Sequence, residues 1–414
     1  MQKKMLALFL RGSSMGSKFL LIIALSKSLT TEDYGVLSMV LTTLTFLMFF
    51  LGLDFYNFSH REIIENDSLK VKFLVNQFWF HLICYVVYIP IIYIIFINDI
   101  IPLSYIIPFY LLLVLEHFGQ ELFRFFNLFN KPNQANLILL IRTGLWIAIM
   151  VIVEYFILER PITIEHVLYY WIAGSFLAVL YSLIYVFIIG STDFKTINWF
   201  SIDKKWIKTG IRISLPFFFG TIAYKIIEYS DRYMIDWFLD KSAVGIYSFY
   251  ANFANIINII VSTITITLIV PNLLRAISAK EPIEIEKQIS KFFKELWVTT
   301  LGVSVIVVFL IFPVLSWQDK PEFKAEIVVY FVILIANIAF NMSLFYHFLL
   351  YAYKKDNSIL KPTIYASLAN IVLNLIFIPK FGLIAAALST LLSFLLILIL
   401  KRKYWLDFNS KDIE

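Results

Sequence analysis

The sequence predicts an all-α polytopic membrane protein with about twelve transmembrane helices in two six-helix bundles. Hydrophobic residues make up 60% of the 414-residue chain and charged residues only 15%, whereas soluble domains carry about 25% charged residues. The apolar residues gather in runs of about 20, the length at which a helix crosses the hydrocarbon core. Lys and Arg concentrate in alternate connections between these runs, as the positive-inside rule expects.

Twelve runs have the length and composition of a membrane span. They are Met5–Leu25, Gly35–Tyr56, Phe73–Ile97, Leu103–Phe126, Gln134–Leu158, His166–Ile189, Thr209–Phe238, Ala243–Pro271, Phe292–Leu315, Glu326–Leu350, Ile359–Ile378 and Leu383–Leu400. With the N-terminus in the cytoplasm, 23 of the 35 Lys and Arg residues fall on the cytoplasmic side and 6 on the outer side. We therefore expect both termini in the cytoplasm. The net charge of +6 then reflects topology, and nucleic acid is not an expected partner.

The six-plus-six division predicts three parts. They are an N-terminal six-helix bundle over residues 1–190, an interfacial amphipathic linker over 191–208, and a C-terminal six-helix bundle with a cytoplasmic tail over 209–414. In the linker, Trp199, Ile202 and Trp206 form an apolar stripe beside lysines, a pattern typical of helices that lie at the headgroups.

A weak internal repeat supports the same division. Leu29–Ser38 and Leu239–Ser248 share Leu, Gly and Ser at corresponding positions, each at the opening of the second span of its half. Because each half holds an even number of spans, the two halves are expected to run parallel, related by an axis along the membrane normal.

Ionisable residues inside the spans are the main functional signal, because they are costly at membrane depth and normally face a bundle interior or a wet cavity. Helical spacing puts Lys225, Glu228 and Arg232 on one face of the seventh span. The candidate substrate-binding cations are Arg11, Lys18, Arg142, Lys225 and Arg232, and the candidates for ion coupling or pairing are Glu116, Glu228 and Asp231. Together they predict a central polar cavity between the halves.

The sign of these charges bears on the substrate. The first span offers Arg11 and Lys18 and no acid, and the seventh stripe has two bases against Glu228. An exporter of cationic drugs would instead place acids on its cavity face. An anionic group such as a phosphate is therefore the better match. The alternative for each residue is an interhelical ion pair that only stabilises the bundle.

Gly12 and Gly16 suit close helix packing on another face of the first span.

No catalytic motif is present. The chain has no phosphate-binding loop, dinucleotide fingerprint, zinc-protease motif or nucleophile elbow, and it has one cysteine. The five histidines are scattered and none stands at metal-ligand spacing, so we expect neither a metal nor a cofactor. The predicted outer loops are too short to hold a catalytic domain. The chain is therefore predicted to move or hold a substrate in the membrane, and not to be an enzyme.

The C-terminal third carries a familiar pattern. The run from Asn370 through Asn374, Pro379 and Gly382 to Thr390 resembles the signature of Wzx-type O-antigen and capsule flippases. These polysaccharide exporters belong to the MOP exporter superfamily, as do the MATE transporters. Shorter resemblances are Thr31-Glu-Asp-Tyr-Gly before the second span and Val244-Gly-Ile-Tyr before the eighth. Ile384 departs from the pattern, since the family usually has glycine there.

The resemblance implies two six-helix bundles around a central cavity in the bacterial cytoplasmic membrane. It implies that undecaprenyl-pyrophosphate-linked oligosaccharide moves from the cytoplasmic to the outer leaflet by alternating access. Membrane lipids are implied partners, as are a polysaccharide polymerase and a chain-length regulator. Two other readings stay open: a MATE-like cation-coupled exporter of small molecules and a membrane-embedded glycan polymerase or transferase.

Overall fold

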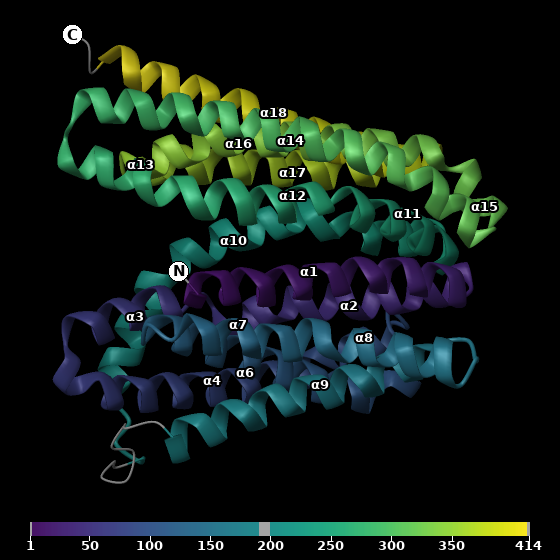
Figure 1. Ribbon diagram of the computed structural model, residues 1–414, viewed down its shortest axis with the longest axis horizontal. Helices are drawn as coiled ribbons and strands as arrows, with labels where there is room; N and C mark the ends of the chain where they lie inside the picture. Colours follow the sequence, from purple (N-terminus) through teal and green to yellow (C-terminus); the bar gives the residue numbers. More distant parts are fainter. Residues whose placement is uncertain (1, 190–198, 412–414) are drawn as a thin grey trace. The chain divides into compact units, whose positions relative to one another are not determined.

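The computed structural model describes residues 2–189 and 199–411, which form helices and connecting turns with no strand (Figure 1). Among these residues, eleven helices are long and apolar enough to cross a membrane. The other predicted span corresponds to α1 (Gln2–Ser28), a 27-residue helix that carries Arg11 and Lys18. The prediction of an all-α polytopic membrane protein is confirmed.

The chain forms two compact units. The first comprises Met1–Leu29 and Val36–Ile222. Its helices are α1, the part of α2 (Thr31–Gly52) that follows Gly35, α3 (Tyr56–Glu65), α4 (Lys70–Ile92), α5 (Ile94–Ile97), α6 (Ile106–Leu128), α7 (Pro132–Leu140), α8 (Trp146–Val151), α9 (Ile164–Ile184) and the first part of α10 (Lys204–Phe238). A π-helical turn, Ile141–Leu145, joins α7 to α8. In this unit α1 packs on α7, and α6 packs on α7 and α9.

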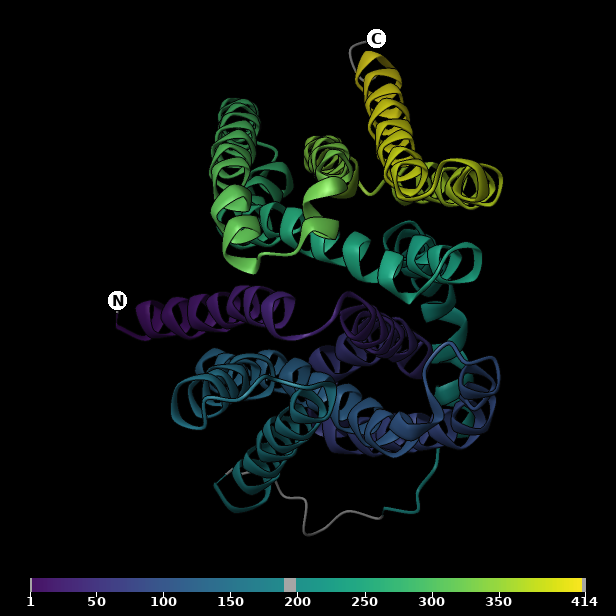
Figure 2. The same ribbon diagram turned by 90° about the vertical axis from the view of Figure 1, so that its right-hand side faces the viewer.

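The second unit comprises Thr30–Gly35 and Ala223–Glu414. After the second part of α10 come α11 (Lys241–Ala254), α12 (Ile256–Val261), α13 (Thr267–Ala279), α14 (Pro282–Gln318), α15 (Pro321–Ala325), α16 (Ile327–Ala352), α17 (Asp356–Phe381) and α18 (Leu383–Lys411). Here α18 packs along both α16 and α17, and α16 also packs on α11 and α14 (Figures 1 and 2).

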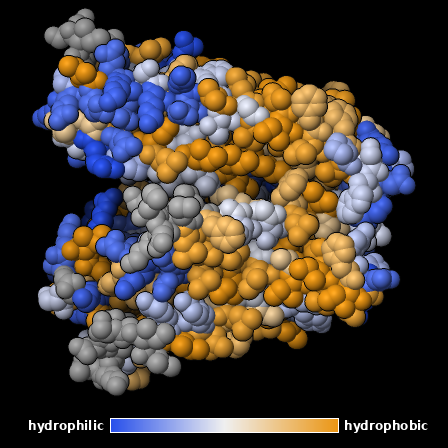
Figure 3. Space-filling view, viewed as in Figure 1, coloured by the Kyte–Doolittle hydropathy of each residue, from blue (hydrophilic) through white to orange (hydrophobic). Residues whose placement is uncertain are grey.

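The surface has the distribution expected of helices in lipid. Hydrophobic side chains cover the middle of the helices, and hydrophilic side chains gather toward the helix ends (Figure 3). Large apolar residues such as Val86 on α4 and Phe309 on α14 are each 70% exposed. Such exposure would be costly in water, so these faces suit contact with acyl chains.

Part of the predicted linker, residues 191–198, lies outside the described residues. Beyond it, Trp206 stands in the first turn of α10 and stacks on Phe73 with ring centroids 5.0 Å apart. Asp203 caps this turn, because its Oδ1 accepts the Trp206 N–H at 3.0 Å. That N–H, together with the Lys72 ammonium, holds the pKa of Asp203 below its usual value. Trp206 therefore packs on the first unit, and its position at the headgroups stays a prediction of the amphipathic stripe.

The two repeat segments adopt the same capped helix start. Thr30 Oγ1 accepts the Asp33 N–H at 3.0 Å at the start of α2. Asp240 Oδ1 accepts the Ala243 N–H at 2.7 Å at the start of α11. Thr30 and Asp240 are corresponding positions of the repeat, so the sequence similarity is matched by the same local hydrogen bonding.

The glycines of the repeat touch each other inside the second unit. A Cβ atom built on Gly35 would lie 1.8 Å from the Lys241 carbonyl oxygen, and one built on Gly245 would lie 2.1 Å from that of Thr31. The contact is reciprocal, because Thr31 and Lys241 are themselves corresponding positions. The glycine hydrogens occupy these places and approach the carbonyls as Cα–H···O contacts. Only glycine fits such a close crossing of two helix starts.

The expected close packing at Gly12 and Gly16 is wrong. A Cβ atom at either position would meet no atom within 4 Å. The tight contact of α1 is made instead by Ser14, whose hydroxyl shares a 2.7 Å hydrogen bond with the Thr143 hydroxyl. Beside it, a Cβ on Gly144 would lie 2.9 Å from the Ser14 Cα. The small residue that permits this approach lies on the partner helix, which the spacing within α1 does not reveal.

Candidate polar site and its relatives

The charged residues predicted in the seventh span gather around a polar pocket of the second unit. The pocket has a volume of about 90 Å³. Its polar lining comes from α10, α11, α12, α16 and α18, and comprises Tyr224, Glu228, Tyr229, Asp231, Arg232, Tyr247, Asn252, Asn255, Asn258, Asn337 and Thr390. Of the predicted stripe of α10, Glu228 and Arg232 line this pocket and Lys225 does not, whereas Asp231, which the helical spacing did not place on this face, also lines it.

Arg232 and Asp231 form a buried, densely bonded pair. Their exposed fractions are 5% and 2%. Arg232 donates from Nη1 to the Glu228 carbonyl oxygen at 2.7 Å and from Nε to Ser248 Oγ at 3.2 Å, and Nη1 lies 3.5 Å from Asp231 Oδ1. The Tyr247 hydroxyl donates to Asp231. Both charges are therefore compensated inside the protein.

Lys225 and Glu228 form a more accessible pair one turn away. Lys225 Nζ lies 2.6 Å from Glu228 Oε2, and both side chains are partly exposed. The sequence predicted a surplus positive charge here, from two bases against Glu228. That count is wrong, because Asp231 pairs with Arg232 although consecutive residues point to different faces of a helix. The two bases and two acids of this stripe balance.

An asparagine network closes the other side of the pocket. Asn258 on α12 donates to Asn255 Oδ1 at 2.8 Å and to Asn337 Oδ1 on α16 at 2.6 Å. Asn341 donates to Asn258 Oδ1 at 2.6 Å. Amide side chains both donate and accept, so this chain of bonds joins α12 to α16 without adding charge.

The first unit holds a second predicted pair, Glu116 and Arg142. Arg142 leaves the π-helical turn and donates from Nη1 to the Glu116 carbonyl oxygen at 2.7 Å, with Nε 3.8 Å from Glu116 Oε2. Glu116 Oε1 accepts Trp171 Nε1–H at 2.9 Å and the Ser175 hydroxyl at 2.6 Å. Gly119 makes room for the arginine, since a Cβ there would lie 2.9 Å from Arg142 Cδ. Glu116 and Arg142 are thus held within the first unit, although Arg142 Nε itself has no hydrogen-bond partner.

Lys18 differs from the other predicted cations. It is exposed on α1, and the charges that act on it are those of Arg142 and Glu116 in the same unit. Arg11 is partly exposed on the same helix. Of the five predicted cations, the first unit thus holds Arg11, Lys18 and Arg142, and the second holds Lys225 and Arg232. Burial separates Arg142 and Arg232 from Arg11, Lys18 and Lys225, whose side chains are at least partly exposed.

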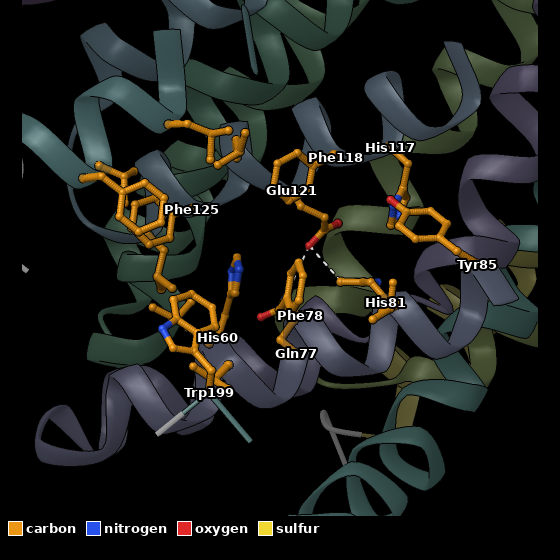
Figure 4. A pocket seen from close by; sticks show the side chains of 18 residues that line it. His60, Gln77, Phe78, His81, Tyr85, His117, Phe118, Glu121, Phe125 and Trp199 are labelled. Carbon is orange, nitrogen blue, oxygen red and sulfur yellow. Dashed lines mark hydrogen bonds and ion pairs between the residues drawn. The ribbon is translucent and has the colours of Figure 1, made fainter. Parts of the chain in front are cut away.

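Sequence reasoning missed a cluster in the first unit. His81 on α4 lies beside His117 and Glu121 on α6, and all three line one cavity (Figure 4). The available signal was the spacing of His117 and Glu121, four residues apart on one helix face. The expectation that no histidine stands at metal-ligand spacing overlooked a partner from a different helix.

Comparison with known proteins decides the family. The family model described as "Polysaccharide biosynthesis protein" matches residues 2–277. The chain belongs to this family. None of the curated proteins matches the chain.

Several solved structures share the fold of this family member. An inward-facing multidrug resistance MATE transporter of the MOP superfamily is 13% identical, with a TM-score of 0.76 over 97% of this chain and 94% of that one. The outward-facing MATE transporter is 14% identical, with a TM-score of 0.62 over the same shares. The lipid II flippase MurJ, in an inward closed conformation, is 16% identical, with a TM-score of 0.62 over 96% of this chain and 86% of that one. The chain thus shares its fold with these solved transporter and flippase structures.

Proposed function

We propose that the protein is a flippase for a polyprenyl-pyrophosphate-linked oligosaccharide, such as an O-antigen or capsule repeat unit. Membership of the polysaccharide biosynthesis family carries this proposal. The MOP transporter fold supports movement between leaflets by alternating access of two bundles, with residues 191–208 as the proposed linker in the sequence. The lipid tail of such a substrate can stay in the bilayer while the pyrophosphate and sugars need a polar path.

Lys18 is the cation that we assign to the pyrophosphate. It is exposed on a membrane helix, whereas Arg142 and Arg232 donate hydrogen bonds to backbone carbonyls of their own units. An ammonium on a flexible stem binds phosphate oxygens as a point charge. Arg11 lies seven residues earlier on the same side of α1 and supports the same role nearer the helix start. Lys225, held by Glu228, serves as a secondary contact.

Lys18→Ala is expected to reduce surface polysaccharide at least about tenfold while the protein remains in the membrane, because an exposed side chain contributes little to stability. The measurement is surface glycan in a flippase-deficient strain, with the amount of membrane protein determined in parallel. Lys18→Arg is the matched control and should retain part of the activity, since arginine keeps the positive charge at this position. Full activity in Lys18→Ala would remove this residue from the substrate path, and loss of the protein would assign it a structural role.

A MATE-like exporter of small cations is the second candidate. It is favoured by the balanced charges around the second-unit pocket, where Glu228 and Asp231 offset the two bases. The same strains separate the two functions. A flippase restores surface glycan without changing resistance to cationic dyes, whereas an exporter raises dye resistance and leaves the glycan absent.

The topology proposed is both termini in the cytoplasm of a bacterial inner membrane, with a polymerase and a chain-length regulator as partners. Reporter fusions at Lys204, where α10 begins, and at Lys241, where α11 begins, test it. We expect the first to report cytoplasm and the second the outer side, because the 35-residue α10 crosses between them. Both reporters in one compartment would contradict the twelve-span arrangement.

A further inference from the structure

We propose that His81, His117 and Glu121 form a binding site for a divalent transition-metal ion, with Zn²⁺ as the expected occupant. One ligand atom from each of the three residues lies within 4.8 Å of the other two. Two imidazoles and one carboxylate form a donor set that Zn²⁺ uses when a fourth position is left for water. The inference does not depend on the proposed transport function.

Both histidines present unused nitrogen atoms. Nε2 of His81 and Nε2 of His117 are buried and have no hydrogen-bond partner, and the side chains are only 7% and 2% exposed. His81 Nε2 has Glu121 Oε2 at 3.4 Å as its nearest acceptor. Buried polar atoms are nearly always hydrogen-bonded, so the orphaned His117 Nε2 requires an explanation. A bound cation supplies one, because an imidazole lone pair coordinates a metal where it finds no proton donor.

The other nitrogen of each ring has the partner that a metal ligand needs. His81 Nδ1 lies 3.4 Å from the Leu51 carbonyl oxygen, which can only accept a hydrogen bond. Donation from Nδ1 to this oxygen leaves the lone pair on Nε2. His117 Nδ1 lies 2.7 Å from the Tyr85 hydroxyl oxygen. Donation from His117 Nδ1 to this hydroxyl would likewise leave the lone pair on Nε2, and such outer-shell bonds orient metal-ligating histidines.

Glu121 keeps one oxygen for the cluster. Arg124 binds Oε1, and its guanidinium lies 3.8 Å over the Tyr56 ring. Oε2 faces the opposite way, accepts a 2.8 Å hydrogen bond from Gln77 and lies 3.4 Å from His81 Nε2. Arg124 therefore holds the carboxylate in place through one oxygen. The other oxygen lies toward Gln77 and His81 (Figure 4).

The local charge also favours a cation. Arg124 lies beside two acids, Glu121 and Asp54, while Arg142, whose charge also acts on His117, is paired with Glu116. Asp54 lines a second pocket of about 90 Å³ that also reaches His117 and Arg124. With neutral histidines, this group carries an excess negative charge. Ligand atoms on Zn²⁺ lie about 2.0–2.2 Å from the ion, so small side-chain rotations are enough to bring the three onto one metal.

The site would join α4 to α6 at the polar wall of a largely apolar cavity. This cavity has a volume of about 170 Å³ and is otherwise lined by side chains such as Phe78, Phe118 and Phe125. Its opening gives the ion an entry path, and its apolar surroundings strengthen the electrostatic attraction between ion and ligands. The ligands come from two helices, so a bound ion would act as a cross-link within the first unit.

The experiment is a Co²⁺ titration of the full chain, purified in detergent with its affinity tag removed. Four-coordinate Co²⁺ absorbs visible light strongly, and competition with Zn²⁺ then gives the Zn²⁺ affinity. We expect one equivalent per chain. His81→Gln, His117→Gln and Glu121→Gln should each weaken binding more than about tenfold, and Tyr85→Phe by about tenfold through the outer shell.

His60→Gln is the matched control, because His60 lines the same cavity but is not one of the three proposed ligands. It should bind the metal as the parent does. Elution of every variant as the same monodisperse peak, together with a Zn²⁺-dependent rise in melting temperature for the parent and His60→Gln alone, separates ligand loss from misfolding. Equal Co²⁺ binding by the parent and the folded His81→Gln/His117→Gln variant would overturn the proposal.

Discussion

Gly35→Ala is expected to destabilise the protein by about 3 kcal/mol, the upper end of the usual cost of overpacking. The added methyl group would stand 1.8 Å from the Lys241 carbonyl oxygen. Backbone cannot rotate away as a long side chain can, so the starts of α2 and α11 must separate. Gly245→Ala should cost a similar amount, because its methyl would stand 2.1 Å from the Thr31 oxygen. Thermal unfolding in detergent measures both.

Gly12→Ala, Gly16→Ala and Gly302→Ala are the matched controls. Each of these glycines also lies inside a helix, but an added Cβ would meet no atom within 4 Å. Alanine is the better helix former by roughly 0.5–1 kcal/mol, so these variants should be as stable as the parent or slightly more so. A Gly35→Ala protein that melts with the controls would show that α2 and α11 do not cross this closely.

Arg232→Met is expected to lower the amount of folded protein sharply, whereas Lys225→Met should leave it nearly unchanged. Removing Arg232 leaves the buried Asp231 carboxylate without its countercharge. Breaking a buried ion pair by deleting one partner lowers the free energy of unfolding by about 3–5 kcal/mol. Lys225 and Glu228 are partly exposed, so the remaining carboxylate can be hydrated. Membrane protein level and melting temperature report the difference.

The double variant Arg232→Met/Asp231→Asn checks the reason for this effect. Removing both charges takes away the uncompensated carboxylate, so we expect it to recover part of the stability that Arg232→Met loses. If Arg232→Met is instead stable and only transport fails, Arg232 belongs to the substrate path. Its contacts with Ser248 and the Glu228 carbonyl would then matter for positioning and not for folding.

Most helices were predictable because each span is a long apolar run whose limits follow from hydropathy alone. The observed ends depart from the prediction where polar residues extend a helix beyond the apolar run. α14 begins at Pro282, ten residues before the predicted start at Phe292, because proline at the first helical position and the charged residues after it are compatible with helix. Hydropathy predicts the apolar part of a helix that crosses the membrane, and it does not predict the polar turns that extend the helix beyond it.

The candidate site was predictable only where its contacts are local. The Lys225–Glu228 pair follows from a spacing of three residues on one helix. The pairing of Arg232 with its neighbour Asp231 was missed, because helical geometry points consecutive residues apart while the long arginine side chain folds back. The cluster of His81 and His117 depends on how α4 packs against α6, and no periodicity within either helix specifies that contact.

The reciprocal contact of Gly35 with Gly245 has a consequence for the ancestry of the chain. In a symmetric homodimer, a residue next to the two-fold axis contacts the same residue of the other subunit. A single codon then determines both residues of the contact. Fusion of two such genes would leave two glycines. Gly35 is then required by the carbonyl of Lys241, and Gly245 by the carbonyl of Thr31. The matched caps Thr30 and Asp240 differ in residue type but make the same hydrogen bond. We therefore expect relatives to vary the caps freely among good capping residues and to keep the two glycines together.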